Sequence, residues 1–184
     1  MNETGLMQAN DSVRLIVVRH AKAARPDVPD VERPLAPRGR RDAPAVGRWL
    51  RDHACAPDMV FCSPSRRTRE TWELALPHLG TAPQVVYDAR VYHGDGDDLL
   101  EVVREAPQSC RTVLLVGHRP AVQELVLELA REEDNPHLGA VRDKFPTAGV
   151  AVLKAPGTWA GLAPGRATLA HFAAPRGVKG PRTN

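Results

Sequence analysis

The residues best suited to chemistry in this sequence are Arg19 and His20, which follow the apolar run of residues 15–18. A short aliphatic run bounded by polar residues predicts a buried strand. In open α/β sheets, ligands bind just beyond the carboxyl ends of the strands. A neutral imidazole placed there can act as a nucleophile, and an adjacent guanidinium can hold phosphate oxygens in a fixed geometry. The pair therefore indicates phosphate chemistry on a histidine.

The same arrangement occurs twice more along the chain. The apolar run 112–116 ends at the motif 117–120 (GHRP), and the run 59–62 ends at the segment 63–68 (SPSRRT). Three strand-to-helix corners in one small chain therefore each carry arginine, histidine or both. We expect them to meet, with Arg67 near a helix start, where free backbone N–H groups favour an anion.

Phosphoryl transfer through an enzyme nucleophile needs in-line attack, fixed positive charge on the phosphoryl oxygens and a stabilised leaving group. We assign the attack to His20 in its neutral form, with its second ring nitrogen donating to a backbone oxygen. Arg19 and Arg67 are expected to clamp the oxygens, and His118, if protonated, adds a donor opposite them. Gly117 is expected to let the backbone approach the substrate closely.

Strand and helix patterns alternate along the chain, which favours an α/β sheet with helices on its faces. Strands are expected over residues 13–19, 58–62, 84–87, 112–116, 148–154 and 167–172. Helices are expected over residues 41–53, 66–79 and 97–105 and after Pro120. Pro44 must then lie in the first turn of its helix or kink it. Residues 132–146 are expected to form a loop at the rim.

Composition narrows the class of protein. The chain has 184 residues, 26% of them charged and 42% hydrophobic, with a net charge of +3 and 4% aromatic residues. This predicts one globular domain over residues 13–174 between flexible tails, 1–12 and 175–184. The charge is too small, and the aromatic residues are too few, to predict a nucleic-acid partner.

The cysteines and the start of the sequence bear on location. Cys55, Cys62 and Cys110 lack metal-ligand spacing, and an odd, scattered count fits free thiols in a reducing compartment. The first residues lack a basic segment followed by an apolar stretch, and no run is long enough to span a membrane. We expect a cytoplasmic protein without a membrane partner.

Taken together, the motifs resemble the histidine phosphatase superfamily, which has the phosphoglycerate-mutase-like fold. The segment 63–71 (SPSRRTRET) is similar to the family pattern Ser-Pro-x-x-Arg-x-x-x-Thr, which makes Arg67 the catalytic arginine. The motif 117–120 is similar to the family's Gly-His-x-Pro. The likeness covers residues 13–173 and implies a three-layer α/β/α sandwich around a central, mostly parallel sheet. It also implies a phosphohistidine intermediate on His20, without a metal or other cofactor.

Three further segments resemble one subgroup, the bacterial phosphohistidine phosphatases that act on phosphorelay proteins. They are residues 19–23 (RHAKA), 32–43 (ERPLAPRGRRDA) and 145–153 (FPTAGVAVL). Lys22 and Arg33 lie in these segments and are candidates for substrate contact, as is Gly117. The alternative for Lys22 and Arg33 is that each is a solvated loop charge without a role in substrate binding.

The general acid is where the sequence departs from the wider family. Mutases and many phosphomonoesterases have a Glu between the second and third motifs, and Ala89 occupies the matching position here. Asp88, one residue away, is the candidate replacement, and the acidic run 132–134 is a second source. Without an acid, an alkoxide would leave slowly, whereas the imidazole of phosphohistidine leaves readily. This departure favours a phosphohistidine substrate.

We therefore expect a metal-independent phosphatase that acts on phosphohistidine in a phosphorelay-type protein. A small-molecule phosphomonoesterase and a non-catalytic module that binds phosphoproteins through the same pocket remain open alternatives. The partner is accordingly a phosphorylated protein or a small phosphorylated molecule, and the sequence predicts no particular oligomeric state. A thiolate mechanism is rejected, because the position where cysteine phosphatases carry arginine is Thr68 when counted from Cys62.

Overall fold

A central sheet organises the computed structural model, which describes residues 12–132 and 135–178. Within these residues the strand order is β3-β2-β4-β1-β5-β6. The strands are β1 (Ser12–Arg19), β2 (Met59–Cys62), β3 (Gln84–Tyr87), β4 (Thr112–Gly117), β5 (Val150–Pro156) and β6 (Thr168–Ala173). Strands β3, β2, β4 and β1 pair in parallel, whereas β5 pairs antiparallel with both β1 and β6. The expected, mostly parallel sheet is confirmed.

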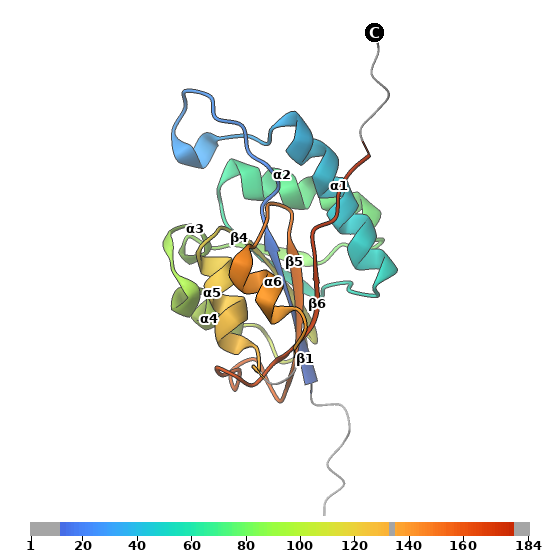
Figure 1. Ribbon diagram of the computed structural model, residues 1–184, viewed down its shortest axis with the longest axis vertical. Helices are drawn as coiled ribbons and strands as arrows, with labels where there is room; N and C mark the ends of the chain where they lie inside the picture. Colours follow the sequence, from blue (N-terminus) through green and yellow to red (C-terminus); the bar gives the residue numbers. More distant parts are fainter. Residues whose placement is uncertain (1–11, 133–134, 179–184) are drawn as a thin grey trace, which may run out of the picture.

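Helices cover both faces of this sheet (Figure 1). The α-helices are α1 (Pro37–Asp52), α2 (Arg66–Ala75), α3 (Arg90–His93), α4 (Gly96–Arg104), α5 (Ala121–Leu129) and α6 (Leu138–Asp143). Two short 3-10 turns are η1 (Asp30–Glu32) and η2 (Leu76–His78). Helices α1 and α2 pack on one face and α4, α5 and α6 on the other, which confirms the α/β/α sandwich.

Strand β1 shows why the central strands are apolar without interruption. Successive side chains of a strand point to opposite faces. Ile16 and Val18 belong to the core under α1 and α2, while Leu15 and Val17 belong to the core under α4 and α5. Each of these side chains is fully buried, which stabilises the fold by about 1.5–3 kcal/mol apiece. A strand covered on both sides therefore needs apolar residues at every position.

Several helical segments differ from expectation in their bounds, and helix α6 was not expected. Helix α1 begins at Pro37 rather than Arg41, because the fixed φ of proline suits the first helical position. Pro44 consequently lies inside the helix instead of in its first turn. Helix α6 occupies part of the segment expected as a loop, because Leu138 and Val141, one turn apart, are both buried.

Only parts of the expected tails fall within the described residues. Ser12 is already the first residue of β1, and the rest of the tail 1–12 lies outside the described residues. At the other end, Arg176 Nη1 donates to Asp42 Oδ2 at 3.2 Å, and Asp42 is buried in α1. This ion pair anchors the beginning of the segment 175–184, whose last residues lie outside the described part of the chain. Among the described residues, no helix is long and apolar enough to cross a membrane.

Candidate active site

The three chemical motifs meet in one hollow at the carboxyl ends of β1, β2 and β4. Its lining residues are Arg19, His20, Lys22, Ala23, Arg25, Arg33, Arg67, His118, Arg119 and Thr147. Parallel pairing of β1 with β4 sets Arg19 opposite Gly117, so the residues that follow the two strands are neighbours. The rings of His20 and His118 are 5.1 Å apart between centroids. The hollow is therefore lined by two imidazoles and a ring of cations.

Backbone hydrogen bonds hold the corner that carries His20. The His20 N–H donates to the Gly117 carbonyl at 3.1 Å. The N–H of Ala148, just before β5, donates to the carbonyls of both Arg19 and His20 at 3.1 Å. Ala148 has a φ of 59°, a left-handed conformation that is costly for any residue with a Cβ. The locally strained Ala148 is thus the residue that holds the backbone of Arg19 and His20 in place.

His20 is held in the form that a nucleophile needs. Its Nδ1 lies 2.7 Å from the Ala21 carbonyl, which can only accept, so Nδ1 carries the proton and Nε2 keeps its lone pair. Burial lowers the pKa of His20 to about 3, and the nearby charges of Arg67 and Arg19 act in the same direction. The ring is therefore neutral at physiological pH.

His118 is also neutral in the free site, and it could add a donor only once protonated. Arg67 Nη2 lies 3.4 Å from Nδ1 of His118, and a guanidinium can only donate. Nε2 then carries the proton and donates to Ser63 Oγ at 2.7 Å. Burial, His20 and Arg67 lower the pKa of His118 to about 3. A phosphoryl dianion in the hollow would raise this pKa and favour the charged ring.

The two arginines are fixed by backbone oxygens. Arg19 Nη1 donates to the Phe145 carbonyl at 2.8 Å, and within the described residues the buried Arg19 Nε has no partner. The side chain of Arg67 is only 8% exposed. Its Nη1 donates to the Asp30 carbonyl at 2.6 Å and its Nη2 to Asp30 Oδ2 at 2.9 Å. Both guanidinium groups retain N–H donors for an anion, since each has five.

Comparison with known proteins agrees with this geometry. The model of the histidine phosphatase superfamily (branch 1) matches residues 15–92. A solved structure from Nakamurella multipartitia, provisionally assigned as the phosphohistidine phosphatase SixA, is 37% identical with a TM-score of 0.79. The alignment covers 89% of this chain and 96% of that one. This chain belongs to the histidine phosphatase superfamily.

Two further relatives complete the description of this histidine phosphatase. An uncharacterized protein of Mycobacterium tuberculosis is 40% identical over 162 residues, which cover 86% of this chain and 100% of the relative. A phosphoglycerate mutase from Plasmodium falciparum shares the fold at 15% identity, with a TM-score of 0.58 over 95% of this chain and 99% of the mutase. The phosphoglycerate-mutase-like fold expected from the motifs is thus confirmed.

Of the remaining sequence candidates, Lys22 and Arg33 line the hollow of the phosphatase and Gly117 does not. A Cβ on Gly117 would lie 3.0 Å from Val122 Cγ1 and 3.3 Å from Val91 Cγ1. A side chain there would crowd these neighbours, because α3 and α5 pack closely against the end of β4. Gly117 is thus closely packed against α3 and α5 and is not among the residues that line the hollow.

Asp88, the candidate acid, is paired with Arg90 and does not line the hollow. Arg90 donates to it from its backbone N–H at 2.8 Å and from Nη2 at 2.7 Å, and Arg90 is itself paired with Glu105. These hydrogen bonds lower the pKa of Asp88, which does not line the hollow. Of the acidic run 132–134, Glu132 pairs with Arg142 and the other two residues lie outside the described part. Asp88 and Glu132 are thus each paired with an arginine, and neither lines the hollow.

Sequence reasoning missed Asp30, which belongs to η1 in a proline-rich loop. Its carboxylate accepts from Arg67 Nη2, from Arg33 Nη1 at 2.8 Å and from the Tyr92 hydroxyl at 2.8 Å. Although burial opposes the effect, these hydrogen bonds hold the pKa of Asp30 well below its usual range. Asp30 belongs to no motif and to no periodic pattern of side chains, so only its tertiary contacts indicate a role.

Cys62 is confirmed as an inert thiol. It is fully buried, and its Sγ donates to the Ser63 carbonyl at 3.3 Å. Burial raises the pKa of Cys62 to about 12, so no thiolate forms near neutral pH. The described residues contain no group of three or more His, Cys, Asp or Glu side chains arranged to hold a metal ion.

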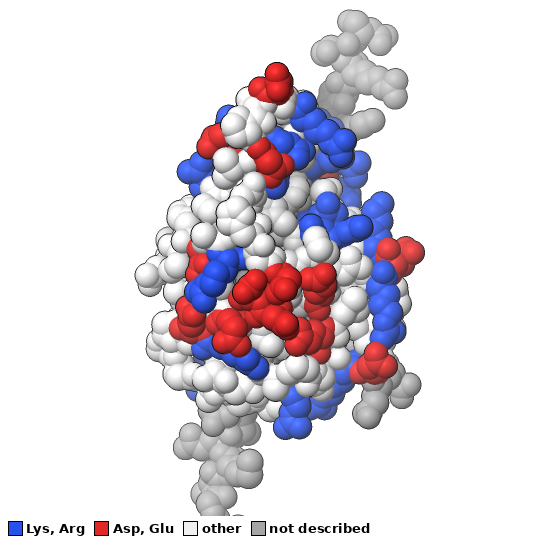
Figure 2. All heavy atoms as spheres, turned by 90° about the vertical axis from the view of Figure 1, so that its left-hand side faces the viewer, with Lys and Arg blue, Asp and Glu red and all other residues white. Residues whose placement is uncertain are grey.

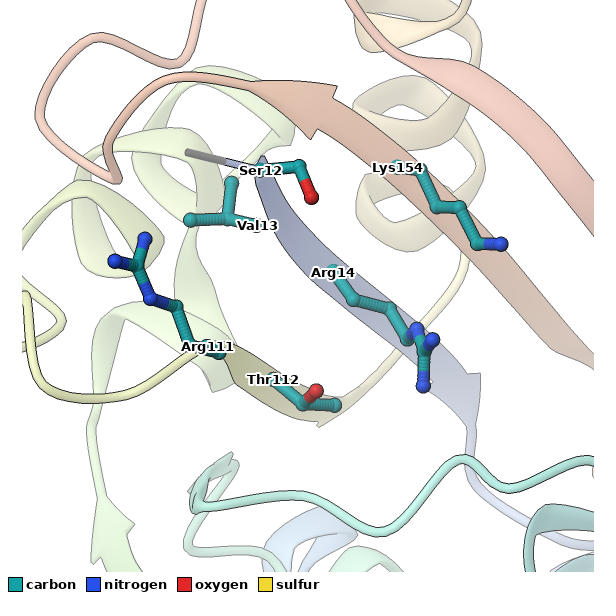
Figure 3. Close-up of a pocket in the computed structure, with 6 residues that line it drawn as sticks. All are labelled: Ser12, Val13, Arg14, Arg111, Thr112 and Lys154. Carbon is teal, nitrogen blue, oxygen red and sulfur yellow. The ribbon is translucent and has the colours of Figure 1, made fainter. Parts of the chain in front are cut away.

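Two other surface features lie outside the hollow. A groove passes from His118 and Arg119 to Asp95 and Glu124, where it meets an acidic surface over α4 and α5 (Figure 2). A second hollow lies at the opposite end of the sheet, lined by Ser12, Val13, Arg14, Arg111, Thr112 and Lys154 (Figure 3). There Arg14 and Lys154 point one way and Arg111 the other, so these cations do not converge on a common point.

Proposed function

We propose that this phosphatase removes the phosphoryl group from phosphohistidine on a protein, through a covalent intermediate on His20. The observation that carries the proposal is the state of His20. One ring nitrogen is tied to the Ala21 carbonyl and the other remains an unprotonated nucleophile among cations. Neutral imidazole is a competent nucleophile toward phosphorus when the developing charge is neutralised.

In the proposed reaction, His20 Nε2 attacks phosphorus as the bond from phosphorus to the substrate imidazole breaks. The departing imidazole takes a proton from solvent. Water then attacks the phosphorus of phospho-His20, which releases inorganic phosphate and restores the neutral ring. Arg19, Arg67 and His118 spread the charge of the phosphoryl oxygens in both steps, and Arg33 and Lys22 extend the cationic surface toward the substrate.

The lining of the hollow supports the choice of leaving group. None of the described residues that line it is an Asp or a Glu. An alkoxide leaving group requires a proton donor, whereas an imidazole can leave without a carboxylic acid to protonate it. The hollow measures about 210 Å³, less than the roughly 300–1,000 Å³ typical of pockets that enclose small molecules. A phosphorylated side chain that projects from a protein fits this size better than an enclosed metabolite.

The test is a comparison of substrates under one set of conditions: a phosphohistidine protein, free phosphoramidate and a panel of phosphomonoesters. We expect the phosphohistidine protein to be hydrolysed with at least about 100-fold higher kcat/KM than any ester. Equal turnover of an ester would instead support the phosphomonoesterase alternative. Tight phosphate binding without turnover of any substrate would support a phosphoprotein-binding module.

The covalent step has its own test in His20→Ala. We expect the substitution to lower kcat by at least about 10³-fold, because no other group replaces the nucleophile. Rapid quench of the wild-type enzyme in alkali should trap phosphate on His20, and quench in acid should lose it, since phosphohistidine is acid-labile. Full turnover by His20→Ala would contradict the mechanism.

We also propose a cytoplasmic location and a single domain over residues 13–174. Cys55, Cys62 and Cys110 are all free thiols, which suits a reducing compartment. Cell fractionation with tagged protein tests the location, and limited proteolysis tests the domain boundaries. Release of a stable fragment much shorter than residues 13–174 would contradict the single domain.

A further inference from the structure

One carboxylate, that of Asp30, gathers donors from three separate segments around the hollow. Arg67 comes from α2, Tyr92 from α3, and Arg33 follows η1. Their hydrogen bonds to Asp30 measure 2.9, 2.8 and 2.8 Å. Two of these three donors, Arg33 and Arg67, line the hollow. Asp30 is thus a common point of attachment for the guanidinium groups that would face the substrate.

Asp30 itself is not among the residues that line the hollow. It contacts both terminal nitrogens of Arg67, Nη1 through its backbone carbonyl and Nη2 through its carboxylate. The guanidinium is therefore held at its outer edge by Asp30. Arg67 Nη2 also lies 3.4 Å from His118 Nδ1, which places His118 on the other side of that nitrogen. These three contacts leave two of the five N–H groups of Arg67 for an anion.

We propose that Asp30 is a positioning residue, which orients Arg67 and Arg33 for the oxygens of a bound phosphoryl group. The inference rests on the proposed function in one respect, which is that the bound anion is a phosphoryl group. Preorganised donors stabilise an anion because no side chain has to be reoriented when it binds. Tyr92 assists by donating to the same carboxylate oxygen as Arg67.

A positioning role and a purely electrostatic role of Asp30 predict opposite changes in phosphate affinity when the carboxylate is lost. A negative charge beside an anion site repels the anion, so loss of that charge alone should tighten phosphate binding. Loss of a positioning contact should weaken it, because Arg67 and Arg33 gain freedom that the anion must then remove. The role also differs from that of a general acid, which would affect only leaving groups that need a proton.

The test measures binding of inorganic phosphate by calorimetry to the wild type, to Asp30→Asn and to Asp27→Asn. Asp27 is an exposed acid of the same loop, and the identical substitution there controls for the change in net charge. We expect Asp30→Asn to weaken phosphate binding at least about tenfold and Asp27→Asn to change it less than about twofold. Unchanged or tighter binding by Asp30→Asn would overturn the proposal.

A double-mutant cycle with Arg67→Ala shows whether Asp30 acts through Arg67. In that background the effect of Asp30→Asn should fall below about threefold, because only Arg33 remains to be positioned. A full tenfold effect without Arg67 would refute the role. Thermal unfolding of each variant verifies that it is folded, and Asp30→Glu should recover part of the affinity if carboxylate placement is what matters.

Kinetics separate positioning from acid catalysis and from failure of the proposed function. Positioning predicts that Asp30→Asn slows phosphoramidate and aryl phosphate hydrolysis by the same factor, whereas an acid would slow the ester alone. The phosphate-binding measurement needs no substrate. It therefore tests Asp30 even if the wild type hydrolyses no substrate at all, the phosphohistidine protein included, an outcome that would refute the proposed function by itself.

Discussion

At the scale of single residues, the site depends on protonation states that the fold imposes. An exposed histidine has a pKa near 6.5 and is partly charged in the cell, and a charged ring is no nucleophile. Burial among cations lowers the pKa of His20 to about 3, and one hydrogen bond selects the ring nitrogen that keeps its lone pair. The cations that would bind the phosphoryl group thus also keep its acceptor neutral.

Asp88 provides a prediction at this scale. Asp88→Asn should change kcat/KM for both phosphoramidates and esters by less than about twofold, because the carboxylate is paired with Arg90 outside the hollow. Parallel assays of the two substrate classes check this. Selective loss of ester hydrolysis would mean that Asp88 leaves Arg90 and acts as the acid after all.

At the scale of elements, the site depends on how closely two helices approach the end of β4. Helix α5 starts just beyond Gly117, and α3 packs against the same point. The Gly117 carbonyl also accepts the hydrogen bond from the His20 N–H. Any displacement of this strand end therefore moves the nucleophile as well as the helix.

Gly117→Ala tests this coupling. The added Cβ would lie 3.0 Å from Val122 Cγ1, so the substitution should lower the free energy of unfolding by about 1–3 kcal/mol. It should also lower kcat at least about tenfold by shifting His20. Urea denaturation and steady-state kinetics measure the two effects.

Gly139→Ala in α6 is the matched control, because nothing lies within 4 Å of its Cβ position. Alanine is a better helix former than glycine, so this variant should gain about 0.5–1 kcal/mol without a change in kcat. If Gly117→Ala behaved in the same way, the packing argument for Gly117 would fail.

At the scale of the whole molecule, two half-buried histidines, His20 and His118, make stability depend on pH. The unfolded chain binds protons on His20 and His118 below about pH 6.5, whereas the native protein does not until about pH 3. The unfolded state therefore holds more protons between these values. Stability consequently rises with pH across this window and is lost as the pH falls through it.

We expect the free energy of unfolding to drop by roughly 1–2 kcal/mol per histidine between pH 7 and pH 5. Urea titrations at the two pH values measure the drop. A variant carrying both His20→Asn and His118→Asn should lose at least about half of it. An equal drop in that variant would assign the pH dependence to other groups.

Bound phosphate should reduce the same pH dependence. A dianion beside His118 raises the pKa of its ring, so the complex takes up a proton that the free enzyme does not. Phosphate should therefore bind more tightly at pH 5.5 than at pH 7.5, after correction for the ionisation of phosphate itself. Calorimetry in buffers of different ionisation enthalpy measures the proton uptake.

The alternation of apolar strands and amphipathic helices was readable from the sequence, because the side-chain periods of strand and helix are local properties. So were Arg19, His20, Arg67 and His118, since each motif is contiguous and follows a strand. Because β2, β4 and β1 are parallel neighbours, their carboxyl ends meet at one edge of the sheet, independently of the loop conformations. For these features, sequence reasoning and structure agree.

Only the tertiary structure decided what surrounds the motifs. Asp30, Arg33 and Tyr92 come from segments with no shared pattern, and their hydrogen bonds arise because the loop after β1 folds back over α2 and α3. The neutral state of His118 likewise depends on burial and on neighbours distant in the chain. The ion pair of Asp88 with Arg90 depends on a contact across a turn. Chemistry carried by contiguous motifs is legible in a sequence, whereas protonation and side-chain orientation depend on the three-dimensional environment that only folding creates.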